Sequence, residues 1–175
     1  TWSSQPGGYH AKLAIGLLNI YDLTKETKYL RTAKNLCDYA LSLQRPDGQF
    51  FTYNDVGGTN LHPHLYTAEG LYIAGVYLKR KKYLTAAGKA VRWALSYEKE
   101  GIVPRHKFGN DINYHERTDI LAQTYRLSML IGIKDDQTDR ILKQILSRQY
   151  FGRQKRQRGG FFFGKLSSGK IVPHV

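Results

Sequence analysis

Apolar residues recur along most of this chain at steps of three and four positions, the spacing of an amphipathic helix. The pattern predicts six helices, over residues 9–23, 26–44, 64–80, 81–97, 117–132 and 136–149. Short polar links, such as the one at 24–26, join these helices into antiparallel αα-hairpins. Turn-forming Pro and Gly residues mark the longer loops between hairpins. We therefore predict an all-α fold built from three αα-hairpins.

The hairpins form an internal repeat, and its period is read directly from two matching segments. The segment TKYLRTAKNLCDYALS at 27–42 aligns without a gap with KKYLTAAGKAVRWALS at 81–96. The preceding segments agree at the same offset, since His10 corresponds to His64. A weaker third copy places Thr118 where these two histidines stand. A unit of this length repeated three times predicts a helical repeat architecture.

The two helices of each hairpin differ in character. The first is apolar nearly all round, as in LAIGLL at 13–18, and this indicates burial on two sides. The second carries charged residues that suit an outer surface. Inner helices ringed by outer helices describe an α/α toroid or a helical solenoid. The 13 tyrosines of the chain would suit a toroid whose axis binds sugar rings.

Four segments are distinctive: LQRPDGQF at 43–50, HPHLYTAEGLYIAG at 62–75, ERTDILAQTYRL at 116–127 and GGFFFG at 159–164. In these segments the sequence resembles the six-hairpin α/α-toroid proteins of carbohydrate metabolism, which include glycosidase-like enzymes, sugar epimerases and toroid proteins of polysaccharide biosynthesis. The resemblance implies a poly- or oligosaccharide as substrate or ligand. Such toroids need about six hairpins, whereas three are predicted here. We therefore expect residues 1–175 to form one incomplete toroid domain with a basic segment at 148–175, completed by a homo-oligomer or by a missing C-terminal half.

In a toroid, the loops that enter the inner helices line one mouth of the central cavity. Helix N-termini there direct partial positive charge and free N–H groups at a ligand. The candidate substrate-binding residues at these entries are His10, His62, Tyr66, Glu116, Arg117 and Gln123, with His115 beside them. Asp55 and Asp111 lie in mouth loops as weaker candidates. Asp47, in PDGQF, is interpreted as a turn residue, with a catalytic acid as the alternative.

The candidates for acid–base catalysis are Glu69, His64 and Asp119. Glu69 lies in an otherwise apolar inner helix, where a carboxylate is costly unless a partner or a cavity solvates it. It can act as an acid, a base or a sugar-hydroxyl acceptor, or it can form a structural salt bridge to Arg117 or Arg126. His64 can instead be a structural cap, and Asp119 an ordinary first-turn residue. From the repeat we expect Glu69 and Gln123 to be neighbours, and the candidates to face one cavity.

Other chemistries lack their motifs. No CxxC or HExxH accompanies His62-Pro63-His64, so we expect no metal and no cofactor. Neither GxxxxGK[ST], GxGxxG nor GxSxG occurs. Cys37 aligns with an outer-helix valine and is interpreted as a core residue. No apolar run reaches the roughly 20 residues of a membrane span, and the chain shows no signal peptide, which favours the cytoplasm.

Charge is unevenly distributed along the chain. No acidic residue follows Asp139, whereas nine of the 27 Lys and Arg residues do. The segment RQYFGRQKRQR at 148–158 interleaves aromatic with basic residues, and its aromatic rings can stack on nucleic-acid bases. An anionic polysaccharide or a lipid surface would satisfy the same charges, and the segment can equally be a solvated loop before GGFFFG. A basic tail on a near-neutral body is unlike a uniformly basic nucleic-acid domain, so we do not expect a nucleic-acid partner.

Two functions from different classes remain. The first is an enzyme that acts on a carbohydrate, of glycoside hydrolase or sugar epimerase type. The second is a non-catalytic helical scaffold that binds a polysaccharide or a protein. Two carboxylates converging in one pocket would favour hydrolysis, whereas one carboxylate with two histidines would favour epimerisation.

Overall fold

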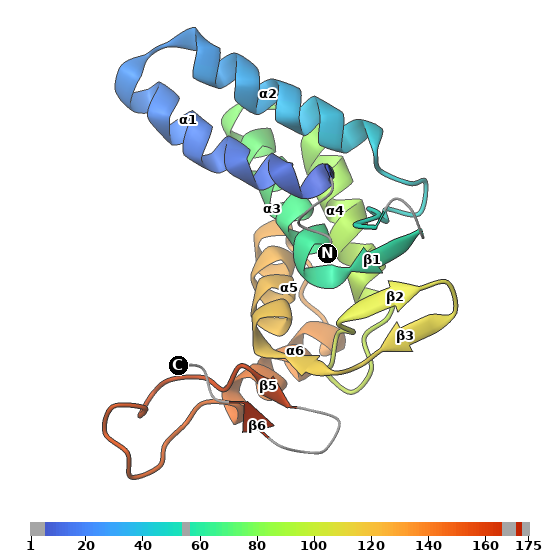
Figure 1. Ribbon diagram of the computed structural model, residues 1–175, viewed down its shortest axis with the longest axis vertical. Helices are drawn as coiled ribbons and strands as arrows, with labels where there is room; N and C mark the ends of the chain where they lie inside the picture. The colour runs from blue at the N-terminus through green and yellow to red at the C-terminus, as the bar shows by residue number, and fades with distance from the viewer. Residues whose placement is uncertain (1–5, 54–56, 166–170, 173–175) are drawn as a thin grey trace.

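The computed structural model describes residues 6–53, 57–165 and 171–172. Within this part of the chain, six α-helices form three antiparallel pairs, α1 with α2, α3 with α4, and α5 with α6 (Figure 1). Their bounds are Leu13–Thr24 (α1), Thr27–Ser42 (α2), Leu61–Tyr77 (α3), Lys81–Leu95 (α4), Thr118–Ile131 (α5) and Asp136–Ser147 (α6). A short helix, η2 (Gly8–Lys12), leads into α1. The predicted all-α fold of paired helices is confirmed.

Helix α3 begins three residues earlier than predicted, and its first turn shows why. The side chain of Asn60, just before the helix, accepts a hydrogen bond from the N–H of His62 at 3.2 Å. Asparagine is a favoured N-cap because its oxygen satisfies an N–H that has no partner inside the helix. Pro63 fits in the first turn, where its missing N–H is not needed. His64 therefore lies inside the helix and does not start it.

The outer helices keep the period that the sequence predicted. Helices α2 and α4 begin at Thr27 and Lys81, the first residues of the two matching segments. Their buried residues correspond at the same offset: Ala33, Cys37 and Ala40 in α2, and Ala87, Val91 and Ala94 in α4. The repeat in the sequence is therefore a repeat of the surface that each outer helix packs against the core.

The inner helices α3 and α5 follow a different spacing. They begin at Leu61 and Thr118, which lie slightly further apart along the chain than the period of the outer helices. Each also carries a buried threonine whose hydroxyl donates to the carbonyl four residues earlier, Thr67 at 3.0 Å and Thr124 at 2.8 Å. These threonines are separated by the same interval as the two helix starts. The structure thus pairs Thr118 with Leu61, where the sequence repeat had placed it opposite His64.

Small residues bring the helices close together. The buried alanines include Ala11, Ala14, Ala33, Ala40, Ala68, Ala74, Ala87, Ala90 and Ala94. Gly70 marks a close approach between α3 and η2, because a Cβ there would lie 2.2 Å from the carbonyl oxygen of Ala11. Any larger residue at position 70 would push η2 away from α3. This contact holds η2 against α3, and it therefore also fixes the position of Lys12, the last residue of η2.

Two small antiparallel sheets hold the long connections. The first has the order β1-β2-β3, formed by Gly58–Asn60, His106–Phe108 and Asp111–Asn113. The second has the order β4-β5-β6, formed by Glu116–Arg117, Gly164–Lys165 and Ile171–Val172. β1 ends directly before α3, and β4 ends directly before α5 (Figure 1). The sheets therefore fix where the inner helices begin.

The segment GGFFFG contacts both the start of α5 and the last strand, β6. Its last phenylalanine, Phe163, accepts a hydrogen bond from the N–H of Thr118 at 2.8 Å and donates to the carbonyl of Val172 at 2.9 Å. The first of these bonds satisfies an N–H at the start of α5, which no side chain caps. The backbone of the residue directly before β5 therefore takes the place of a side-chain cap for α5.

Helix α1 exposes an apolar stripe. Leu13, Ile20 and Leu23 have exposed fractions of 59, 40 and 86 %. Such a stripe is what the open edge of an incomplete ring would expose, and its cover by a second copy or by a further part of the chain stays a prediction. No described helix combines the length and the apolar character that crossing a membrane requires.

Candidate functional site

Two inner helices turn polar faces toward each other. In α3, His62, Tyr66 and Glu69 are spaced by four and three residues, so they lie on one face of the helix. In α5, Asp119, Gln123 and Arg126 have the same spacing. Each set begins one residue after the first residue of its helix. Side chains at equal heights on the two helices therefore meet.

The first meeting point is an imidazole–carboxylate pair at the start of both helices. Nδ1 of His62 lies 3.0 Å from Oδ2 of Asp119. Arg117, just before α5, holds the same carboxylate with two N–H groups, Nε donating to Oδ1 at 3.0 Å. Burial alone would raise the pKa of the Asp119 carboxyl, but the hydrogen bonds from His62 and Arg117 outweigh burial and lower the pKa to about 2. Asp119 is therefore a carboxylate at neutral pH.

The second meeting point lies two turns further along. Glu69, with a side chain 9 % exposed, accepts from Arg126 Nη1 at 2.6 Å and pairs with Lys12 Nζ at 2.9 Å. Burial raises the pKa of Glu69, but the two cations outweigh burial and the pKa is lowered overall. The sequence had offered Arg126 as one structural partner, and the structure shows that ion pair. The ion-pair partners of Glu69 are thus Lys12 and Arg126. The sequence repeat had instead predicted Gln123 as its neighbour.

Tyr66 connects the two meeting points. Its ring lies 4.2 Å from the His62 ring, centroid to centroid, and the Lys12 ammonium sits 3.6 Å from its centroid. The connected set therefore runs from η2 through α3 to α5. We call it the polar strip, and it consists of Lys12, His62, Tyr66, Glu69, Arg117, Asp119 and Arg126.

Two polar atoms beside the strip have no protein partner among the described residues. They are the side-chain oxygens of Gln123 and Thr118, both fully buried. Leaving a buried acceptor or hydroxyl unsatisfied costs about 1–3 kcal/mol, so native sites commonly supply a partner from water or a ligand.

His64 does not join the strip, although the sequence had offered it as a catalytic residue. Its side chain is fully buried in the core. Nδ1 accepts from the N–H of Phe50 at 3.2 Å, and Nε2 lies 2.9 Å from the carbonyl oxygen of Ala90, to which it donates. Burial lowers the pKa of His64 to about 4, so the ring is neutral at pH 7. Both ring nitrogens are thus committed to the backbone, which is the structural alternative for this residue.

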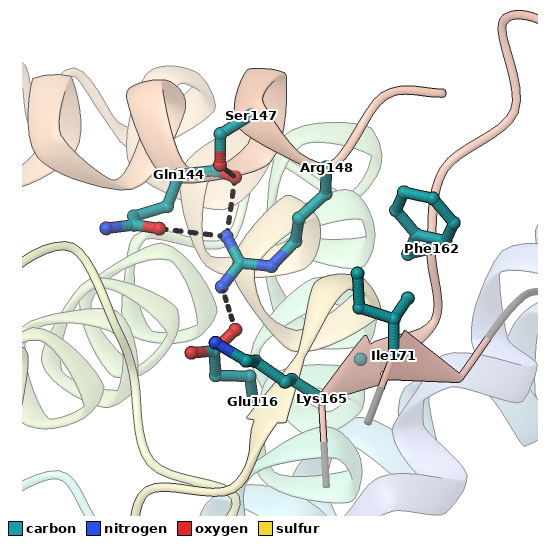
Figure 2. A pocket seen from close by; sticks show the side chains of 8 residues that line it. Glu116, Gln144, Ser147, Arg148, Phe162, Lys165 and Ile171 are labelled. Carbon is teal, nitrogen blue, oxygen red and sulfur yellow. Dashed lines mark hydrogen bonds and ion pairs between the residues drawn. The ribbon is translucent and has the colours of Figure 1, made fainter. Parts of the chain in front are cut away.

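Glu116 also lies apart from the strip, on the other side of β4. Its Oε2 accepts from Nη2 of Arg148 at 2.6 Å (Figure 2). Arg148 donates in addition to the side chain of Gln144 at 3.2 Å. These residues line a separate pocket of about 260 Å³ against β5. The structure therefore divides the residues of ERTDILAQTYRL between two places.

The other candidates have simpler surroundings. The carboxylate of Asp47 accepts from the N–H of Gln49 at 3.0 Å, which is a turn-stabilising contact. His10 lies in η2, half-buried, with its ring 4.3 Å from that of Tyr9. His115 is half-buried before β4, and Asp111 is exposed in β3. Asp55 lies outside the described residues.

Sequence reasoning missed Lys12. A signal was available, because Lys12, Glu69 and Arg126 are evenly spaced along the chain, and their charges alternate. Alternating charges at a fixed spacing on packed helices predict ion pairs across the helices. The shorter period of the outer helices concealed this signal.

Metal ligation finds no support within the described parts of the chain, where no group of three His, Cys, Asp or Glu side chains could hold a metal ion. His62 and His64, the pair with the most metal-like spacing, point to different surroundings. His62 contacts Asp119, whereas His64 is bonded to the core backbone.

Compared by sequence, the chain matches no protein-family model and no curated protein. Compared by structure, it is similar to the cellobiose 2-epimerase from Bacillus thermoamylovorans B4167, with a TM-score of 0.72 and 13 % identity over 94 % of this chain and 46 % of the epimerase. It is also similar to the unsaturated glucuronyl hydrolase from Bacillus sp. GL1, responsible for the degradation of glycosaminoglycan, with a TM-score of 0.64 and 18 % identity over 90 % of this chain and 50 % of the hydrolase.

These likenesses define the class of fold. The chain has the helical architecture of the α/α-toroid proteins, and its three helix pairs form part of such a toroid. It spans about half the length of the two structures. The resemblance to α/α-toroid proteins that the sequence suggested is thereby confirmed at the level of the fold.

Proposed function

We propose that this chain belongs to a carbohydrate-active α/α toroid, in which the polar strip binds a sugar and His62 exchanges a proton with it. The observation that supports this is the 3.0 Å contact between Nδ1 of His62 and the carboxylate of Asp119. A carboxylate at one ring nitrogen fixes the tautomer and orientation of an imidazole. Nε2, the ring nitrogen away from Asp119, is then the atom at which the proton moves.

The charge states of the two carboxylates favour one reaction class over the other. Hydrolysis of a glycosidic bond requires one carboxylic acid that is protonated and one carboxylate. The pKa values of Glu69 and Asp119 are both lowered, so neither side chain holds a proton at neutral pH. Proton abstraction next to a carbonyl, as in sugar epimerisation, requires one base and groups that stabilise negative charge. His62 can supply the base, and Arg117 and Lys12 the positive charge.

Other groups in the polar strip and beside it suit a sugar. Tyr66 offers an aromatic ring to the apolar face of a pyranose, and the buried oxygen of Gln123 offers an acceptor to a hydroxyl. Glu69, neutralised by two cations, has a positioning role in this proposal and not a catalytic one. A non-catalytic scaffold would use the same groups for binding alone.

The test uses the full chain with two probes chosen from the structural neighbours, cellobiose and an unsaturated glucuronyl disaccharide. Proton exchange with deuterium oxide at the sugar carbon, followed by NMR, reports epimerisation, and loss of the ultraviolet absorbance of the unsaturated ring reports hydrolysis. The variants are His62→Gln and Asp119→Asn. The matched controls are His106→Gln, in β2, and Asp139→Asn, exposed on α6.

We expect exchange on cellobiose that falls about 10²–10⁴-fold in both strip variants and stays unchanged in both controls. Equal rates in the strip variants and the wild type would contradict the proposal. Binding of a probe without any conversion would favour the scaffold. Absorbance loss that depends on Asp119 would favour hydrolysis instead.

A further inference from the structure

A second pocket lies outside the polar strip, between α6 and the C-terminal sheet. It measures about 260 Å³ and is lined by Glu116, Gln144, Ser147, Arg148, Phe162, Gly164, Lys165 and Ile171 (Figure 2). Small-molecule sites usually occupy about 300–1,000 Å³, so this volume suits one sugar ring and not a longer oligosaccharide. Its lining combines charged groups with the apolar side chains of Phe162 and Ile171.

The charged groups of this pocket are only partly used by the protein. Arg148, with a side chain 9 % exposed, is committed to Glu116 and Gln144. Among the described residues, the Lys165 ammonium forms no ion pair or hydrogen bond, and only one carboxylate oxygen of Glu116 is engaged. The pocket thus carries a net positive charge, with one ammonium and one acceptor oxygen available to a ligand.

We propose that this pocket binds a carboxylate-bearing sugar unit of an acidic polysaccharide. The ligand's carboxylate would pair with Lys165, one of its hydroxyls would donate to Glu116, and an apolar ring face would contact Phe162. The acceptor at Glu116 disfavours a plain polyanion, because a second negative charge there would be repelled. A uronic acid unit offers a negative group, hydroxyl donors and an apolar face together.

The neighbouring basic segment favours the same ligand. This segment, residues 148–158, lies in a loop whose ends meet where the N–H of Tyr150 donates to the carbonyl of Gly160 at 2.8 Å. The Tyr150 ring lies 5.9 Å from the Phe162 ring, centroid to centroid. The loop carries exposed cations: Arg153, Lys155, Arg156 and Arg158. Because Phe162 lines the pocket, the base of this loop adjoins one wall of the pocket. Such a cluster attracts an extended anionic chain over a distance of about 10 Å at ordinary ionic strength.

This inference goes beyond the proposed function, because it concerns a separate site and does not require His62 to be catalytic. The probes are an oligogalacturonate tetramer, a neutral cellotetraose of equal length and a single-stranded oligonucleotide. The variant is Lys165→Gln, and the matched control is Lys134→Gln, which removes an exposed charge before α6. Dissociation constants are measured by calorimetry at low and at physiological ionic strength.

We expect the wild type to bind oligogalacturonate at least about tenfold more tightly than cellotetraose, and Lys165→Gln to lose about tenfold. Lys134→Gln should change the affinity less than about twofold. Equal losses in both variants, or equal affinity for the two tetramers, would overturn the proposal. Tighter oligonucleotide binding with the same Lys165 dependence would assign the pocket to nucleic acid. Failure of the proposed function would be seen separately, because that function is measured by deuterium exchange on cellobiose, whereas this proposal is measured by tetramer affinity.

Discussion

Replacing Glu69 by glutamine removes one charge from the polar strip while keeping the shape of the side chain. Glu69 holds two cations, Lys12 at 2.9 Å and Arg126 at 2.6 Å. At these distances each pair interacts by about 1.5 kcal/mol in a water-like dielectric, which applies because both cations are more than a third exposed. Part of this attraction is offset by the desolvation of the carboxylate. We therefore expect Glu69→Gln to destabilise the protein by about 1–2 kcal/mol.

The loss should depend on pH in a defined direction. The pKa of Glu69 is lowered in the folded protein, so its contribution to stability is present above the unfolded-state pKa of about 4.5 and is lost as the pH falls through the folded-state value. Thermal denaturation of the wild type and the variant across this range measures the difference directly. At neutral pH the melting temperature should fall by about 2–6 °C. Once the pH falls below the lowered folded-state pKa, the two proteins should converge, because the glutamate is then neutral as well.

A control separates this ion-pair network from ordinary surface charge. Glu26→Gln removes a carboxylate whose partner, Lys28, is 58 % exposed, and it should leave the melting temperature nearly unchanged. If Glu69→Gln lowers the melting temperature equally at every pH, from neutral down through the acid range, the effect is one of packing and the electrostatic reasoning fails. An unchanged melting temperature with lost binding of a sugar would instead place Glu69 in contact with the ligand.

Three further outcomes follow from the geometry. Gly70→Ala should cost about 1–3 kcal/mol in urea denaturation, because the added methyl would displace η2 and with it Lys12; an unaltered midpoint would contradict this close approach. The free energy of unfolding should fall by a few kcal/mol as the pH drops from 6.5 to about 4, because His64 takes up a proton in the unfolded state but stays neutral in the folded state. His64→Gln should remove this dependence on pH. Cys37, fully buried and with its pKa raised to about 12 by burial, should react with iodoacetamide only after unfolding.

The sequence was sufficient for the helix pairs because their periodicity is strong. The outer helices repeat small residues at buried positions, as Ala33 and Ala87 show, and small residues at fixed intervals are a direct trace of packing. The assignment of Asp47 to a turn also followed from local chemistry, since its carboxylate contacts an N–H two residues away. Local interactions of this kind are encoded over a few residues.

The candidate site was harder to predict because it depends on where each helix begins. His62 and His64 are two positions apart, so they point to opposite sides of α3, and a shift of the helix start changes which of them faces the next helix. The cap from Asn60 and the contacts of His64 with Phe50 and Ala90 decide the outcome, and the latter are tertiary contacts. The sequence therefore identified residues that lie together on α3 and α5, but not which histidine meets Asp119.

The two-residue strand β4 shows how the strip and the second pocket are related. Successive side chains of a strand point to opposite faces. Glu116 accordingly faces Arg148 in the pocket, while Arg117 faces Asp119 at the strip. Arg117 also lies over the ring of Phe163, at 4.8 Å, and the carbonyl of that residue receives the first N–H of α5. β4 and its neighbouring strand β5 thus fix the positions of both sites relative to each other. Any displacement of β5 would move Arg117, which holds Asp119, together with the wall of the pocket.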